Sequence, residues 1–431
     1  MNDDTQGFRP DAVQWLVGAM AVFAGVFPLI AEGISESRIF VLIVLIAVWA
    51  FWVWRNPRGG TPLIVPLLAI LTAFVTGAIV IMLAAEGSLM ERVVTGYQGY
   101  AALVDGAFLR TRGFTNTLVA STPLILTGLA VALAFRAGLF NIGAEGQYLM
   151  GATFGVVMGY AVSLPPVLHT IAVLIAGAIG GGIWGAIPGF LKARLGAHEV
   201  INTIMMNFIA IFLVDWLINN PLRDEGATST IRTPFIEPSA QLPQFSEIGF
   251  LAPYFATNDR LHLGFIIAIL AAVAVWYLLW KTTVGFELRT TGANPDAARY
   301  AGIKVERSTI LAMTLSGALA GLAGAIEVQG VIRYLPAFFE AGYGFDAIAV
   351  ALLAQNNPFG VIPASILFGA LSVGADILQI RTGVSQHIIS IIQALILLFV
   401  AAPALIRYLY RLRNLEETDI EQVPLTRGWG S

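Results

Sequence analysis

Polar side chains interrupt the apolar stretches of this 431-residue sequence at few places, and these are the places where chemistry could occur. The most informative is the segment 136–147, Arg-Ala-Gly-Leu-Phe-Asn-Ile-Gly-Ala-Glu-Gly-Gln, in which three glycines, an amide and a carboxylate separate two apolar runs. One interpretation is a plain turn that places Glu145 in the first turn of the next helix, where the helix dipole favours an acid. The other is unwound backbone that lines a path for a solute.

Six polar residues are candidates for such a path, because polar groups inside a membrane are costly and usually face a cavity or a partner helix. They are Asn141, Glu145, Gln147, Asn202, Asn207 and Glu327. For the two asparagines of the run 200–218, a hydrogen bond between helices is the alternative interpretation. Glu327 ends an apolar run, where a carboxylate needs a partner or water.

No arrangement of residues in the sequence predicts catalysis or a metal site. The four histidines are scattered, no cysteine is present, and no Ser/His/Asp pattern occurs. A P-loop requires a glycine-rich turn that ends in Gly-Lys-Ser/Thr, and Lys281-Thr282 follows Trp280 instead. We therefore predict a protein that is not an enzyme, binds no metal or cofactor, and leaves any ATP hydrolysis to partner subunits.

The composition explains why so few polar positions exist. Hydrophobic residues make up 57% of the chain and charged residues 12%, about half the share found in soluble domains. A net charge of −3 offers no basic field for nucleic acid. These values exclude a soluble enzyme, a disordered chain and a nucleic-acid binder, and they indicate that the lipid bilayer surrounds most of the chain.

We predict an all-α integral membrane protein with ten to twelve transmembrane helices, since about 20 apolar residues cross a bilayer. Apolar runs lie near 13–31, 39–54, 63–85, 115–135, 145–163, 168–191, 200–218, 262–280, 308–327, 345–355, 359–378 and 387–406. The second run is short, and the tenth could be a half-helix. The acidic N-terminus lacks the basic region of a secretory signal, so the first run is expected to remain as a span.

The distribution of basic residues predicts the orientation. If all twelve runs cross and the N-terminus is cytoplasmic, 15 of the 24 basic residues and all three lysines lie inside. Both termini are then cytoplasmic. If the tenth run does not cross, the basic cluster at 407–413 lies outside, which the positive-inside rule disfavours.

Small residues recur every fourth position in two of the runs, which allows close approach of helices in lipid. They are Gly181, Gly185 and Gly189 in one run and Gly317, Gly321 and Ala325 in the other. Packing within one chain is one interpretation, and a face that forms a dimer is the other. Pro188 and Pro363 lie inside runs and predict kinks or broken helices.

Two stretches resemble each other and predict an inverted-topology repeat. In each, a run rich in glycine and alanine is followed by a short loop and then by a glycine that opens another apolar run. When Gly196 is aligned with Gly383, residues 201–204 lie over residues 388–391, with opposite predicted orientations. Chance similarity between apolar segments is the alternative.

The most charged internal connector, 281–307, contains a predicted short helix of about two turns. Asn294 suits the N-cap and Pro295 the first helical position. Asp296 lies in the first turn, where a negative charge is favourable, and Gly302 can end the helix. Such a helix is either a solvated connector or an element that docks into a groove of a partner.

The connector also carries a family resemblance. The pattern Asp296-Ala297-Ala298-x-x-x-Gly302 resembles the Glu-Ala-Ala-x-x-x-Gly coupling loop of ABC importer permeases, with Asp in place of Glu. FRAGLFNIGAEGQYLMG at 135–151, LRTTGANPDAARYAGI at 288–303 and LSGALAGLAGA at 315–325 resemble the simple-sugar/nucleoside branch of branched-chain-type permeases. Sugar permeases of that family have Gly-Ile-Asp-Leu-Ser-Val-Gly where this chain has Phe-Asn-Ile-Gly-Ala-Glu-Gly. The resemblance covers residues 115–406 and is closest to the nucleoside permease group paired with basic-membrane-lipoprotein-type binding proteins.

The resemblance implies a permease subunit of an ABC importer, with nucleosides favoured and a simple sugar such as ribose as the alternative. It implies ATPase subunits, a second, paralogous permease subunit, an extracytoplasmic binding protein, and a prokaryotic inner or plasma membrane. ATPase coupling would fall to Arg289, Gly292, Asn294, Pro295, Asp296, Ala297, Ala298 and Gly302. An ion-coupled transporter that acts alone is the rival, and it would need a relay of buried carboxylates or histidines.

The expected domains follow from these assignments. Residues 1–90 form an N-terminal tail with additional spans, and residues 91–410 form the permease domain with the coupling helix within 289–303. Residues 411–431 form a C-terminal tail.

Overall fold

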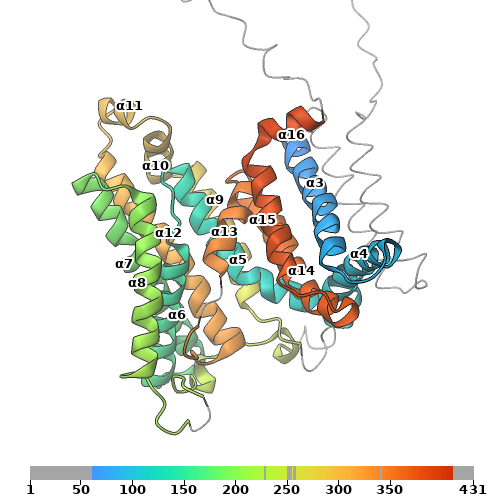
Figure 1. Ribbon diagram of the computed structural model, residues 1–431. Helices are drawn as coiled ribbons and strands as arrows, with labels where there is room; N and C mark the ends of the chain where they lie inside the picture. Colours follow the sequence, from blue (N-terminus) through green and yellow to red (C-terminus); the bar gives the residue numbers. More distant parts are fainter. Residues whose placement is uncertain (1–60, 228–229, 250–254, 256–258, 340–341, 411–431) are drawn as a thin grey trace, which may run out of the picture. The chain divides into compact units, whose positions relative to one another are not determined.

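The computed structural model describes residues 61–227, 230–249, 255, 259–339 and 342–410 (Figure 1). The described residues divide into two compact units, one that includes residues 61–75 and 398–410 and one within residues 76–397. The first two predicted spans and the acidic N-terminus lie outside the described residues.

The first unit is described at residues 61–75 and 398–410. It contains the first part of α3 (Thr61–Ala84) and all of α16 (Pro403–Leu409). Leu68 and Ala69 of α3 are buried with Ile406 of α16. The hydroxyl groups of Thr72 and Tyr410 lie 3.0 Å apart, within hydrogen-bonding distance.

The second unit is a bundle of helices. In chain order it contains α4 (Leu89–Val104), η1 (Asp105–Leu109), α5 (Gly113–Arg136), α6 (Ala144–Ala161), α7 (Pro166–Leu195), α8 (Glu199–Asn219), η2 (Pro238–Ala240), η3 (Phe245–Glu247), α9 (Gly264–Lys281), α10 (Thr283–Ala293), α11 (Pro295–Tyr300), α12 (Val305–Glu327), η5 (Val328–Ile332), α13 (Tyr343–Leu353), α14 (Pro358–Thr382) and most of α15 (Ile388–Ala401). Among the described residues, β-pairing is confined to two isolated bridges, Arg232 with Pro336 and Gln244 with His262.

Seven helices within the described part of the chain are long and apolar enough to cross a membrane. The count becomes eight if α15 and α16, which are bent at their junction, form one span. α13 has 11 residues and is therefore about 16 Å long, roughly half of the ~30 Å hydrocarbon core. This length fits the half-helix alternative for the tenth predicted run.

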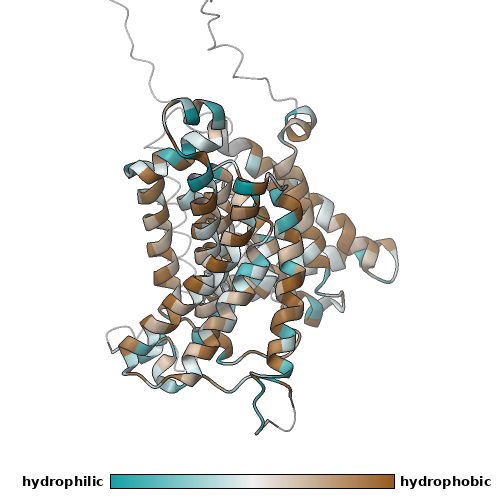
Figure 2. Cartoon of the chain, turned by 90° about the vertical axis from the view of Figure 1, so that its left-hand side faces the viewer, coloured by the Kyte–Doolittle hydropathy of each residue, from teal (hydrophilic) through white to brown (hydrophobic). Residues whose placement is uncertain are grey.

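Exposed apolar side chains cover the outward faces of the helices, which suits a lipid environment. On α7, Ile171, Ile175, Ile179, Ile183 and Ile187 are 38–54% exposed and recur every fourth residue. Figure 2 shows hydrophobic residues along the helices and hydrophilic residues gathered mostly toward the ends. A soluble bundle would bury such a stripe.

Glycines hold α12 against α6 and α7 at the centre of this bundle. A Cβ atom on Gly181 would lie 2.6 Å from the Cα of Gly321, and one on Gly185 would lie 3.0 Å from the Cα of Gly317. A Cβ on Gly151 of α6 would overlap Gly321 directly. Close packing within the chain, one of the two interpretations of the glycine pattern, is therefore confirmed.

α5, from the first half of the chain, packs against α14 of the second half, and α12, from the second half, packs against α7 of the first half. α5 packs most extensively against α14, then against α12 and α13, whereas α12 packs most extensively against α7, then against α6 and α5. α7 and α14 continue through Pro188 and Pro363 as single helices. They end at Gly196 and Gly383, the two glycines aligned in the sequence, and both glycines have left-handed backbone angles (φ +68° and +70°).

Two helices were missed by the search for apolar runs. α4 is amphipathic and carries Glu91 and Arg92 in its first turn, so it does not read as a long apolar segment. Ser88 and Glu91 form a capping box at its start, a Ser-x-x-Glu pattern that the sequence displays. α10 is capped by the Thr282 hydroxyl, which accepts a hydrogen bond from the Gly285 amide.

Candidate functional site

The segment 137–143 leads from α5 into α6 and is anchored by buried amide side chains. The Nδ2 of Asn141 donates to Gln147 Oε1 at 2.9 Å and to Ser316 Oγ of α12 at 2.8 Å. Its Oδ1 accepts from the Gly143 amide at 2.9 Å. Asn141 and Gln147 are at most 1% exposed, so their polar groups are compensated inside the bundle.

The two predicted asparagines of α8 differ in their surroundings. Asn207 is buried, and its Oδ1 accepts from the Gly146 amide while its Nδ2 donates to the Ile142 carbonyl, both at 2.8 Å. The alternative interpretation, a hydrogen bond between helices, is confirmed for Asn207. The Nδ2 of Asn202 is buried and has no hydrogen-bond partner among the described residues.

Glu145 links α6 to the beginning of α13. It lies in the first turn of α6, as the turn interpretation predicts. Its Oε1 accepts from the Gly342 amide at 3.0 Å, and its Oε2 accepts from the Gly344 amide at 2.7 Å. The carboxylate thus satisfies amides at the start of α13 and lies at the positive end of that helix dipole, although it belongs to another helix.

Glu145→Ala is expected to lower the free energy of unfolding by about 3 kcal/mol, because two amides lose charge-assisted hydrogen bonds. The free energy of unfolding of Glu145→Gln should lie between those of the wild type and Glu145→Ala, since glutamine keeps one acceptor oxygen. Thermal unfolding of the purified protein measures the effect, with exposed Glu225→Gln as control. A variant that unfolds like the wild type but has lost uptake would contradict this structural role.

Aromatic side chains pack together where α6 meets the start of α13. Tyr148 is fully buried, and its ring lies 6.1 Å from that of Phe339 and 5.7 Å from that of Tyr343. The Tyr148 hydroxyl has no hydrogen-bond partner among the described residues. Glu327, at the end of α12, is only 7% exposed. Tyr148 is not among the site residues predicted from the sequence, although it lies three residues after Glu145 and so on the same helix face.

The predicted short helix of the connector is confirmed as α11. Asn294 Oδ1 accepts from the Asp296 and Ala297 amides, each at 3.0 Å, and Pro295 occupies the first turn. Gly302 follows the helix with a left-handed φ of +82°. The Ile303 amide donates a hydrogen bond to the Ala298 carbonyl at 2.9 Å, which ends the helix.

The residues assigned to ATPase coupling have two kinds of surroundings. Exposed positions are Asn294, Pro295, Asp296, Ala297 and Gly302. Ala298 is buried. Gly292 lies against the backbone of the 136–138 turn, and Arg289 donates from Nε to the Leu279 carbonyl at 2.9 Å. Gly292 and Arg289 thus hold α10 against the bundle. Tyr300, which the sequence analysis did not single out, is 95% exposed.

The opposite end of the bundle carries the loop between α8 and α9 (Figure 1). His262 of this loop is buried, and burial together with the charge of Arg260 lowers its pKa to about 4. The ring is therefore neutral at physiological pH, and its Nδ1 accepts from the Gly264 amide at 3.1 Å. Among the described residues, no group of three or more His, Cys, Asp or Glu residues could hold a metal ion.

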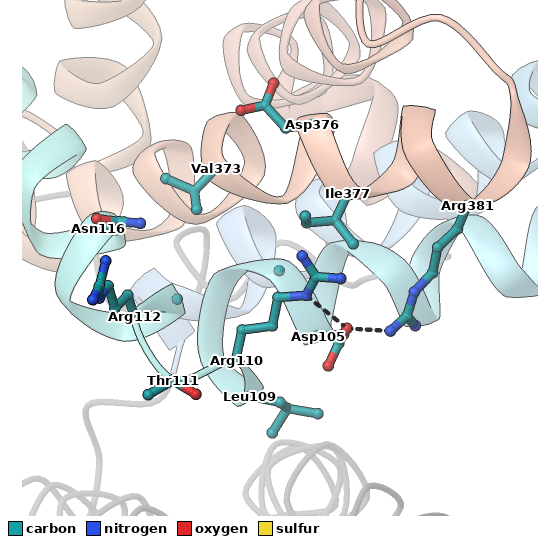
Figure 3. Close-up of a pocket in the computed structure, with 12 residues that line it drawn as sticks. Asp105, Leu109, Arg110, Thr111, Arg112, Asn116, Val373, Asp376, Ile377 and Arg381 are labelled. Carbon is teal, nitrogen blue, oxygen red and sulfur yellow. Dashed lines mark hydrogen bonds and ion pairs between the residues drawn. The ribbon is translucent and has the colours of Figure 1, made fainter.

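A pocket of about 720 Å³ lies at this end, between η1 with the start of α5 and the last turns of α14. Figure 3 shows Arg110 and Arg381 pointing to Asp105 from two sides. Arg112 lies 3.9 Å from Asp259 of the α8–α9 loop. The pocket therefore has an arginine-rich rim on the face that carries the long loop.

The fold is that of a multi-pass membrane protein with apolar helices that face outward, a buried polar junction, and a capped helix at one end, all of which suit a permease. A family model for the permease component of branched-chain amino acid transport systems matches residues 113–401. The chain belongs to this family. It is a multi-pass membrane protein that serves transport and is not an enzyme.

Several curated proteins are similar over most of their length. The guanosine ABC transporter permease of Bacillus subtilis is 43% identical over 359 residues, which cover 80% of this chain and 95% of that protein. The nucleoside ABC transporter permease of Lactococcus lactis is 35% identical, with 80% and 92% covered. The glucose ABC transporter permease of Haloferax volcanii is 34% identical, with 78% and 86% covered. No solved structure matches.

Proposed function

We propose that this chain is the transmembrane permease subunit of an ABC importer for nucleosides. The observation that carries the proposal is the 43% identity to a guanosine permease over 95% of that protein. The identity to the nucleoside permease of Lactococcus lactis agrees with it. In this proposal separate ATPase subunits drive alternating access, and this chain binds no cofactor.

α11 is proposed as the element on which an ATPase subunit docks. Its support is the match to the coupling-loop pattern, together with a capped helix whose outer surface presents Asp296, Ala297 and Tyr300 to solvent. The ion-coupled rival is less well supported, because Asn141, Glu145 and Asn207 are engaged in hydrogen bonds within the chain.

For the substrate path we propose the junction of α6, α12 and α13, with Asn141, Glu145, Gln147, Asn202, Asn207 and Glu327 at or near it. The rings of Tyr148 and Tyr343 lie 5.7 Å apart, where α6 meets the start of α13. Aromatic rings stack on flat heterocycles, and a carboxylate accepts hydrogen bonds from ribose hydroxyls or base N–H groups. Both properties suit a nucleoside.

A second, paralogous permease subunit is proposed as partner. Bacillus subtilis has two guanosine ABC transporter permeases in the comparison, and the second is 27% identical over 59% of this chain. An extracytoplasmic binding protein would approach the face with the α8–α9 loop and the arginine-rich pocket. The proposed location is the prokaryotic inner or plasma membrane, with both termini cytoplasmic.

The inverted repeat and the count of ten to twelve spans stay proposals, as do the domain limits at 90 and 410. Two observations support the repeat. α5 of the first half packs against α14 of the second, and α12 of the second half packs against α7 of the first. Gly196 and Gly383 end α7 and α14 in the same backbone conformation. A repeat that begins at α5 and again at α12 would place the path between the halves.

Uptake by the complete complex in proteoliposomes tests the substrate. Labelled guanosine, other nucleosides, ribose and glucose are offered, with ATP supplied on the side of the ATPases. Nucleosides are expected to be taken up and to compete with one another, while sugars do not compete. The reverse result would favour a sugar permease, for which the identity to the Haloferax volcanii protein is the specific argument. Uptake without ATPase subunits would favour the ion-coupled rival.

A further inference from the structure

A groove of about 670 Å³ runs along the N-terminal part of α12, beside the C-terminal end of α7 and the end of α11. Four basic side chains, Arg194, Arg299, Lys304 and Arg307, line it, and Glu306 is the only acid that does. Ile310, Leu311 and Thr314, each half-buried, form the part that extends along α12.

The acids of this region are already paired. Glu306 lies 3.3 Å from Arg194, and Asp296 lies 2.8 Å from Arg299. Lys304 and Arg307 are exposed and have no ion pair among the described residues. The groove therefore has two positive charges in excess, and no side chain caps the amides at the start of α12. Both features favour an anion at the rim.

The depth of the groove restricts the kind of anion. From Lys304 to Thr314, α12 rises about 15 Å, which is half of the ~30 Å hydrocarbon core. An occupant that fills the groove has a negatively charged head at the helix end and an apolar body that lies against α12 inside the bilayer. A soluble subunit docked on α11 would contact only the rim.

We propose that this groove binds an anionic phospholipid, with the headgroup phosphate held by Lys304 and Arg307 and an acyl chain along Ile310, Leu311 and Thr314. Basic pockets beside transmembrane helices are suited to such headgroups. The proposal goes beyond the transport function and does not depend on which solute is carried. A lipid held here would lie between α7, α12 and α11.

Native mass spectrometry of the purified complex with added phosphatidylglycerol, and with phosphatidylcholine of the same acyl chains, tests the proposal. The wild type should retain phosphatidylglycerol preferentially. Lys304→Gln with Arg307→Gln should weaken retention on the order of tenfold. Lys281→Gln, an exposed lysine outside the groove, is the matched control and should bind like the wild type.

Two further arms separate the lipid from other occupants. Leu311→Asn should also reduce phosphatidylglycerol retention, and inorganic phosphate should not displace the lipid, because the apolar body contributes to binding. Equal retention by the double variant would overturn the proposal. So would displacement by inorganic phosphate, or a double variant that loses the ATPase subunits while its lipid retention is unchanged. Thermal unfolding of each variant checks that the fold persists.

Discussion

Tyr300→Asp is expected to abolish co-purification of the ATPase subunits while the permease still inserts into the membrane. The ring lies on a helix of six residues and is 95% exposed among the described residues. Large aromatic side chains in this position commonly dominate an interface, and loss of one weakens association on the order of 30-fold. Affinity purification through a tag on the permease, with quantification of the ATPase, measures the result.

The choice of variants in α11 decides how the result is interpreted. Tyr300→Phe keeps the ring and should retain the ATPase, and Ala297→Asp should act like Tyr300→Asp because Ala297 is exposed. Ala298 is buried, so a charged residue there would disturb the helix itself and would not isolate docking. Wild-type amounts of ATPase on both aspartate variants would reject α11 as the docking element.

Gly321→Ala is expected to lower the free energy of unfolding by about 3 kcal/mol and to reduce the amount of protein in the membrane. The new Cβ would lie 2.7 Å from the Cα of Gly181 and would also overlap the Gly177 carbonyl. These are backbone atoms, so no side chain can rotate away, and α7 and α12 would have to separate.

Gly249→Ala is the matched control, because a Cβ there meets nothing within 4 Å. Thermal unfolding of both purified variants, with the protein content of isolated membranes, checks the expectation. If Gly321→Ala unfolds within about 1 °C of Gly249→Ala, the close approach of α7 and α12 does not stabilise the fold as described.

Much of the fold follows from local features of the sequence. The hydropathy of the run at 168–191 predicts α7, because about 20 apolar residues are needed to cross a bilayer. The pattern Asn294-Pro295-Asp296 predicts the start of α11 to the residue, since N-cap chemistry involves only neighbours along the chain. The glycine spacing predicts a close helix contact, and the structure identifies its partners.

The polar junction could be predicted only in part. Asn141, Glu145 and Gln147 draw attention because polar residues are rare in this chain, yet their partners Ser316, Gly342 and Gly344 are distant in sequence. No local pattern connects Glu145 to α13. The turn interpretation correctly places Glu145 in the first turn of α6, but neither interpretation predicts that its carboxylate satisfies the amides of another helix.

The bond between Glu145 and the Gly342 amide also imposes an order on biosynthesis, because the two residues are 197 positions apart. A ribosome adds roughly 5–20 residues per second, so α6 exists for about 10–40 s before α13 is made. During that interval its carboxylate has no α13 to bind, and a charged group without a partner is costly in hydrocarbon. We expect α6 to remain at the translocon or in contact with water until the second half of the chain arrives.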